Sequence, residues 1–105
     1  QAETHKAHGN ALFKNGDFAE AVQAYSQALA IDAESSVLYS NRSGAFASLA
    51  CYEQALADAE RCIALRPDWA KGHTRQASAL HGLARFARAI DAYDAALAVE
   101  PGNEA

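Results

Sequence analysis

Long apolar runs, basic stretches and cysteines are all scarce in this chain of 105 residues. No segment approaches the roughly 18 consecutive apolar residues that a membrane-spanning helix needs, and no basic stretch leads into an apolar one as in a signal peptide. The sequence therefore predicts a soluble protein with no membrane partner, located in the cytoplasm, with the nucleus as the alternative. Because the chain begins at Gln1 and not at a methionine, we expect a fragment of a longer protein.

The two cysteines and four histidines give little sign of a metal site. Cys51 and Cys62 lack the Cys-x-x-Cys spacing of metal ligands, so the prediction is free thiols. His5 and His8 are three residues apart, but no third ligand of fixed spacing accompanies them. We therefore expect neither a bound metal nor another cofactor.

Positive charge and catalytic motifs are scarce as well. The chain has nine Lys and Arg residues against 13 Asp and Glu residues, a net charge of −4. A nucleic-acid surface normally needs a basic face, so this balance argues against nucleic acid as a partner. The sequence has no Gly-rich phosphate loop, nucleophile elbow or pair of catalytic carboxylates, so we expect no enzymatic activity. The glycosylation pattern Asn41-Arg42-Ser43 is interpreted as a chance match.

What the chain does contain is an internal repeat with a period of about 34 residues, which runs three times. The positions in register include Phe18, Tyr52 and Phe86, then Ala21, Ala55 and Ala89, and then Leu29, Ile63 and Leu97. Half of the residues are apolar and 21% are charged, which is typical of a folded globular protein. The prediction is a single domain over residues 1–105 that consists of repeats 2–35, 36–69 and 70–103.

Each repeat is expected to form two helices, because no alternation of the β type competes with the helical periodicity. Asn15-Gly16-Asp17 breaks the first repeat, with Asp17 as a candidate N-cap, and prolines end later helices at Pro67 and Pro101. The predicted helices are 2–15, 18–31, 36–48, 52–65, 70–82 and 86–99. Alanines in register should let paired helices approach closely. Four aromatic residues should fill the gaps between the helices, namely Phe18, Tyr25, Phe86 and Tyr93.

A helical hairpin of this length and phasing resembles the tetratricopeptide repeat family over essentially the whole chain. The resemblance implies an all-α fold, a right-handed superhelix of three hairpins in which the first helix of each pair lines a concave groove. The last helix carries Ile90, Tyr93 and Leu97, and most of the polar capping helix that stacked repeats need is missing. We expect the parent protein to supply this helix, or the fragment to self-associate there.

Cations and amides gather on the helices predicted to line the groove. Lys6 and Asn10 are four residues apart on one helix, and Lys71 and Arg75 repeat that spacing. Asn41 lies one period before Arg75 and so takes the same place in its own repeat. A solvated helix surface is the simpler interpretation of such residues. We favour a carboxylate site, because no Asp or Glu is expected beside these donors.

These five residues resemble the two-carboxylate clamp of chaperone-binding tetratricopeptide domains. The stretches around them, residues 37–43 and 66–73, look most like the first such domain of the Hsp-organising co-chaperone family. The resemblance implies a co-chaperone adaptor that binds the C-terminal Glu-Glu-Val-Asp tail of a cytosolic chaperone. Lys6, Asn10 and Asn41 would hold the terminal carboxylate. Lys71 would hold the last aspartate side chain, and Arg75 a group further upstream.

The same resemblance implies an apolar wall formed by Phe13, Gly44 and Ala47. Ser48 and His81 lie on the groove side, where relatives often carry a charged residue, so they bear on the choice of chaperone. The partner is expected to be a heat shock protein 70 class chaperone in preference to one of the heat shock protein 90 class.

Three further expectations concern single residues and the parent protein. His73 and His81 would raise affinity for an anionic ligand below neutral pH, since imidazolium adds positive charge. Trp69 is expected to pack between the fourth and fifth helices. Two alternatives to the adaptor remain open: the targeting domain of a multidomain enzyme such as a tetratricopeptide protein phosphatase, and a repeat scaffold that binds an internal segment.

Overall fold

Six α-helices make up residues 1–100, the part of the chain that the structure, a computed structural model, describes. They are α1 (Ala2–Lys14), α2 (Phe18–Ile31), α3 (Ser36–Ser48), α4 (Tyr52–Leu65), α5 (Ala70–Gly82) and α6 (Phe86–Val99). The predicted all-α class and the number of helices are confirmed, and the only different boundary is the end of α1, one residue earlier than expected. Pro101 and the last residues of the predicted third repeat lie outside the described residues.

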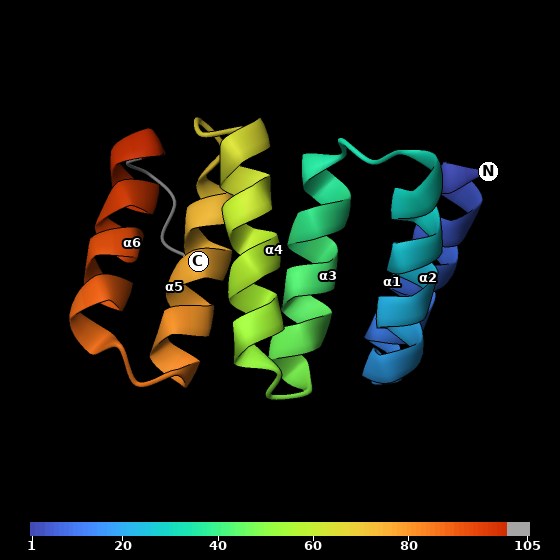
Figure 1. The fold of residues 1–105 in the computed structure, drawn as a ribbon, viewed down its shortest axis with the longest axis horizontal. Helices are drawn as coiled ribbons and strands as arrows, with labels where there is room; N and C mark the ends of the chain where they lie inside the picture. Colours follow the sequence, from blue (N-terminus) through green and yellow to red (C-terminus); the bar gives the residue numbers. More distant parts are fainter. Residues whose placement is uncertain (101–105) are drawn as a thin grey trace.

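The helices form three hairpins that stand side by side in a row (Figure 1). Each hairpin packs onto the next through contacts of α2 with α3 and of α4 with α5. The first helices of the hairpins also contact one another in order, α1 with α3 and α3 with α5. This order leaves α6 at one end of the row, with no later helix within residues 1–100 to cover it.

The turn inside each hairpin has the same backbone conformation. Gly16, Ala50 and Ala84, which occupy the same place in their repeats, have φ of 85°, 61° and 61°. The amide that follows each of them donates to a carbonyl five residues earlier, at 2.8 Å in all three turns. This is the hydrogen bond of a Schellman motif, which favours glycine at the left-handed residue. Only the first repeat has that glycine.

Helix starts are capped less regularly than the sequence suggested. Asp17 occupies the N-cap position of α2, but its side chain makes no capping hydrogen bond. Ser35 does cap α3, because its hydroxyl oxygen accepts from the Leu38 amide at 3.2 Å.

Small residues allow the helices of each pair to approach closely, as predicted. Ala21, Ala55 and Ala89 are buried in their three hairpins. Gly9 lies against Tyr25, and a Cβ atom at Gly9 would come within 2.7 Å of that ring. Tyr25 fills its gap as expected and is only 1% exposed.

The aromatic residues of the last helix do not pack as predicted. Phe86 and Tyr93 are 54% and 42% exposed, although their counterparts Phe18 and Tyr25 are partly or fully buried. The physical reason is that α3 covers α2, whereas α6 has no such neighbour in the described part of the chain. Ile90 and Leu97 are exposed on the same face, as expected.

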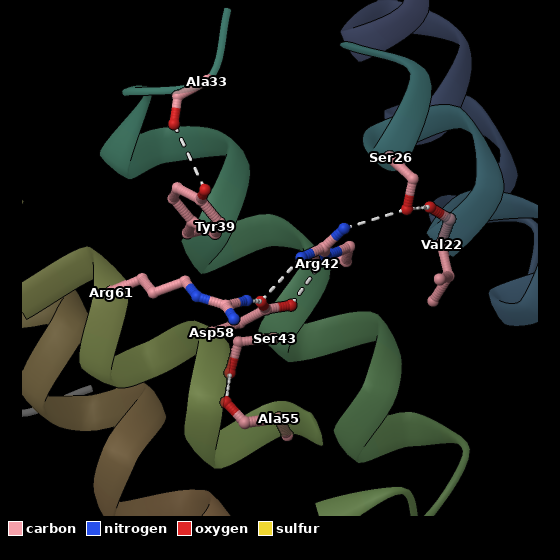
Figure 2. A network of polar contacts seen from close by, with 9 residues as sticks. All are labelled: Val22, Ser26, Ala33, Tyr39, Arg42, Ser43, Ala55, Asp58 and Arg61. Carbon is pink, nitrogen blue, oxygen red and sulfur yellow. Dashed lines mark hydrogen bonds and ion pairs between the residues drawn. The ribbon is translucent and has the colours of Figure 1, made fainter. Parts of the chain in front are cut away.

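A buried ion pair joins the two helices of the second hairpin, and its arginine also reaches α2 of the first hairpin (Figure 2). Asp58 of α4 is 1% exposed and accepts two hydrogen bonds from Arg42 of α3, at 2.7 and 2.8 Å. Arg42 also donates to the Ser26 hydroxyl of α2 at 3.0 Å, and Arg61 donates to Asp58 from the surface. The hydrogen bond to Asp58 raises the pKa of the Arg42 guanidinium above its ordinary value. This network was not predicted from the sequence.

Three smaller expectations can also be checked against the structure. Cys51 and Cys62 are free thiols, the second of them buried. Trp69 is half-buried just before α5, with the Arg66 guanidinium 4.9 Å from its ring centre. Of the helices described in residues 1–100, none combines the length and the apolar character that crossing a membrane requires.

Candidate binding groove

Two adjoining hollows form a groove on the face lined by α1, α3 and α5. The first, here called the clamp hollow, has a volume of about 230 Å³ and is lined by Asn10, Phe13, Tyr25, Asn41 and Arg75. The second, here called the distal hollow, has a volume of about 310 Å³. Its lining residues are Phe13, Gly44, Ala47, Ser48, Tyr52, Arg75, Ser78, His81 and Gly82. Because Phe13 and Arg75 line both hollows, the groove is continuous from one to the other.

The two asparagines of the clamp hollow are held by each other and by a buried tyrosine. The Asn10 side-chain oxygen accepts from the Tyr25 hydroxyl at 2.6 Å and from the Asn41 amide at 3.3 Å. This oxygen is therefore occupied, whereas the Asn10 amide nitrogen donates to no residue within 1–100. An asparagine whose acceptor is occupied can offer a ligand only donors, which suits an anion.

Arg75 lies between the two hollows without a carboxylate partner among residues 1–100. Its Nε donates to the Ser40 hydroxyl at 3.4 Å. A Cβ atom at position 44 would lie 2.8 Å from Nη1, so Gly44 gives the guanidinium room to lie against α3. Burial lowers the pKa of Arg75 below its ordinary value, but an arginine remains charged at neutral pH. A partly buried cation without a counter-ion favours the binding of an anion.

Tyr25 responds to the same surroundings. Burial raises the pKa of its hydroxyl, and the nearby charge of Arg75 acts in the opposite direction. The hydroxyl therefore stays protonated at neutral pH and continues to donate to Asn10. Tyr25 was predicted only as a core residue. Its counterpart in the second repeat is Ala59, which has no hydroxyl, so the repeat gave no sign that Tyr25 also positions the Asn10 side chain.

The two predicted lysines line neither hollow. Each lies one helical turn before a residue that does, Lys6 before Asn10 and Lys71 before Arg75. Lys71 is exposed and makes no ion pair with any of residues 1–100. Lys6, however, pairs with Glu3 at 3.2 Å, so the expectation of a clamp without acidic neighbours was wrong at this position. Glu3 comes one turn before Lys6 on α1, and its side chain is 85% exposed, so the pair is weak enough for a ligand to replace it.

The distal hollow brings together the residues of the predicted apolar wall, Phe13, Gly44 and Ala47. Ser48 and His81 also line it, as expected from the helical spacing. Three lining residues were missed: Tyr52, Ser78 and Gly82. Ser78 had a signal, because it stands one period after Gly44 and two periods after Asn10, which both line the groove.

His73 does not lie in the groove, which corrects the expectation that it would tune affinity there. Its Nε2 lies 2.8 Å from the Pro67 carbonyl oxygen, and its side chain lines a different hollow between α5 and α6. Eight residues on an α-helix turn the side-chain direction by about 80°, so His73 and His81 point to different surfaces of α5.

The charge of the groove differs from that of the whole chain. Thirteen acidic residues give the chain its net charge of −4, yet no Asp or Glu lines either hollow within residues 1–100. Nor do three His, Cys, Asp or Glu side chains gather as metal ligands anywhere in that range. The groove is thus a strip rich in hydrogen-bond donors on an acidic protein.

Comparisons with known proteins show similar sequences and structures. A family model described as TPR repeat matches residues 9–49. The Hsp70-Hsp90 organizing protein of Triticum aestivum is 50% identical over 98% of this chain, which spans 18% of that protein. The chain thus corresponds to only a small part of such relatives.

Two solved structures of similar domains contain peptides. The first TPR of Spaghetti (RPAP3) bound to HSP90 peptide SRMEEVD has a TM-score of 0.95 and 30% identity, over 99% of this chain and 82% of that one. The second TPR domain of human RPAP3 in complex with HSP70 peptide SGPTIEEVD has a TM-score of 0.93 and 31% identity, over 99% and 87%. Both of those domains, which share the fold described here, hold a peptide that ends in EEVD.

Proposed function

Because this chain belongs to the tetratricopeptide repeat family, we propose that its groove binds the free C-terminal Glu-Glu-Val-Asp tail of a cytosolic heat-shock chaperone. The protein would then act as a co-chaperone adaptor in the cytoplasm, without enzymatic activity of its own. One domain of three repeats would form the groove, over residues 2–35, 36–69 and 70–103.

The observation that supports this function best is the donor arrangement around Arg75. Asn10 has its acceptor occupied, and Arg75 has no carboxylate partner among residues 1–100. A peptide that ends in aspartate brings two carboxylates within one residue, which can satisfy both sets of donors by charge-assisted hydrogen bonds.

Each clamp residue has a proposed role. Lys6, Asn10 and Asn41 hold the terminal carboxylate, and Lys6 exchanges the exposed Glu3 for the ligand in doing so. Lys71 holds the last aspartate side chain, and Arg75 holds a group further upstream. Phe13, Gly44 and Ala47 line the groove beside the valine.

Calorimetric titration with a heptapeptide that ends in Glu-Glu-Val-Asp tests the proposal. We expect a dissociation constant on the order of micromolar, because only a few side chains of a flexible peptide become ordered. Amidation of the peptide C-terminus and Arg75→Ala should each weaken binding at least about tenfold, or about 1.4 kcal/mol. Lys71→Ala should have an effect in the same direction.

Arg88→Ala is the matched control, since it also removes one arginine, but an exposed one on α6 that lines a hollow outside the groove. It should leave the affinity within about twofold. Equal affinity for free and amidated peptides would contradict the proposal and favour a scaffold that binds an internal segment.

A further inference from the structure

Tyr25 lies buried in the lining of the clamp hollow, and its hydroxyl has a single hydrogen-bond partner. Tyr25 comes from α2, the second helix of its hairpin, and is 1% exposed. Within residues 1–100 its hydroxyl donates only to the Asn10 side-chain oxygen, at 2.6 Å. The ring fits there because Gly9, the residue before Asn10, has no Cβ atom to collide with it. The proton of Tyr25 therefore has one acceptor, and that acceptor belongs to the groove.

The other repeats show that helix packing does not require this hydrogen bond. The residue in register with Tyr25 is Ala59 in the second repeat, where the hairpin packs without a tyrosine at this position. It is Tyr93 in the third repeat, but that residue is 42% exposed. Neither of the residues in register with Asn10 is an amide. The bond is thus a feature of the groove and not of the repeat.

The Tyr25 proton determines which end of the Asn10 amide a ligand meets. A half-turn of an asparagine amide exchanges its oxygen and its nitrogen. A reversed Asn10 can still donate to the oxygen of Tyr25 and to the oxygen of a reversed Asn41, so the two asparagines alone do not fix the direction. Reversal would, however, leave the buried Tyr25 donor without an acceptor, which is costly. Asn10 is therefore held with its oxygen occupied and its amide nitrogen free to donate to a ligand.

The two possible ends of a peptide differ in the hydrogen bonds that they offer to Asn10. A free carboxylate offers only acceptors, whereas a C-terminal amide also carries a nitrogen that donates. A donor that meets a donor leaves both groups without a partner. Asn10 in a fixed orientation thus discriminates against the amide by hydrogen bonding, in addition to the effect of the lost charge.

We propose that Tyr25 is a positioning residue that sets the specificity of the clamp hollow for a free carboxylate, by holding Asn10 with its donors toward the ligand. This inference rests on the proposed function, since it assumes that Asn10 meets the end of a tail. It gives the second helix of the first hairpin a role in recognition, although only the first helices were expected to form the groove.

Removal of the hydroxyl alone tests the role of Tyr25. Tyr25→Phe keeps the ring that packs against Gly9 and deletes only the donor. The probes are the peptide SRMEEVD with a free C-terminus and the same peptide amidated, each in competition with a fluorescent copy of the free peptide. The measured ratio is the dissociation constant of the amidated peptide divided by that of the free peptide. We expect this ratio to fall about three- to tenfold in Tyr25→Phe, because Asn10 can then reverse and offer its oxygen to the amide.

Tyr39→Phe is the matched control. It also removes one tyrosine hydroxyl, which donates to the Ala33 carbonyl oxygen at 3.2 Å outside both hollows, and it should leave the ratio unchanged. A second control introduces Tyr25→Phe into an Asn10→Ala protein, where no amide remains to be positioned and the ratio should not respond. One measurement needs no variant: in NMR spectra, the Tyr25 hydroxyl proton should stay protected from exchange with water in the free protein and in the complex.

The possible outcomes separate this role from the proposed function. If Tyr25→Phe weakens both peptides by the same factor, the ratio is unchanged, and Tyr25 is a purely structural residue while the clamp stands. A fall of the ratio that persists in the Asn10→Ala protein, or rapid exchange of the hydroxyl proton in the complex, would also refute the role. If the unmodified protein binds free and amidated peptides equally, the proposed function fails, and this inference with it.

Discussion

At the scale of single residues, the Arg42–Asp58 pair shows how a polar group can be buried without being part of a binding site. Asp58 is almost fully buried. Its carboxylate oxygens accept hydrogen bonds from Arg42 of the neighbouring helix α3 and from Arg61, one turn further along α4. Removing one partner of a buried pair leaves an uncompensated charge, which costs more than the pair contributes.

We therefore expect Asp58→Ala to destabilise the protein by about 3–5 kcal/mol. Urea denaturation followed by circular dichroism measures this change in the free energy of unfolding. Asp91→Ala, at an exposed position, is the control, and its free energy of unfolding should stay within about 0.5 kcal/mol of that of the unmodified protein. A double variant, Arg42→Met with Asp58→Leu, should recover part of the loss, since an apolar pair avoids the desolvation of two charges. A small effect of Asp58→Ala would mean that the carboxylate is hydrated in solution.

The sequence did contain a signal for this pair, although only the repeat makes it visible. Asp58 stands one period from both Ala24 and Ala92, and all three positions are buried. A charged residue where the other two repeats carry a buried alanine needs a partner. Which residue supplies it was not predictable, because Arg42 comes from the preceding helix and its counterparts are His8 and Gln76.

At the scale of helices and turns, the repeat period predicted almost every boundary. In each hairpin, a residue with left-handed backbone conformation follows the first helix, and the second helix starts two residues after it. What the pattern did not reveal is that two of these left-handed residues are alanines. Ala50 and Ala84 adopt φ of 61°, where a Cβ atom costs roughly 1–2 kcal/mol relative to the right-handed region.

Replacing these alanines by glycine should stabilise the protein. We expect Ala50→Gly and Ala84→Gly each to add about 0.5–1 kcal/mol, because relief of the strain exceeds the greater flexibility of glycine in the unfolded chain. Thermal unfolding would show a higher midpoint for each variant. Ala11→Gly, at an exposed position inside α1, should instead lower the free energy of unfolding by about 1 kcal/mol. A loss at Ala50 as large as that at Ala11 would exclude a left-handed residue in the turn.

The groove was predictable to the extent that it depends on helix spacing. Asn10, Asn41 and Arg75 lie together because the first helices of the repeats pack in order. The period places Asn41 in register with Arg75, and Asn10 in register with Gly44, which also lines the groove. The i,i+3 spacing of Glu3 and Lys6 allowed their ion pair, which the prediction overlooked. The hydrogen bond of Tyr25 to Asn10 joins two helices and depends on side-chain conformations that spacing does not give. Spacing alone also could not separate His81 from His73.

At the scale of the whole molecule, the row of hairpins ends at α6, which no later helix within residues 1–100 covers. Phe86, Ile90, Tyr93 and Leu97 form an apolar strip on α6, with exposed fractions from 42% to 60%. The corresponding face of α4 is covered by α5. An exposed strip of this kind favours association with a further apolar surface, such as that of a second copy.

One pair of substitutions separates the effect of a helix's position in the row from the effect of a residue's position in its repeat. Ile90 and Leu56 occupy the same position of their repeats, yet Ile90 is 60% exposed and Leu56 is 7% exposed. Leu56→Gln should lower the free energy of unfolding by about 2–5 kcal/mol, because it leaves a cavity and buries an amide. Ile90→Gln should change the free energy of unfolding by less than about 0.5 kcal/mol. Urea titration at low protein concentration measures both.

Sedimentation at increasing protein concentration should show less self-association for Ile90→Gln than for the unmodified chain. A loss of several kcal/mol for Ile90→Gln would mean that this face is covered already, and that the row of hairpins has no open end.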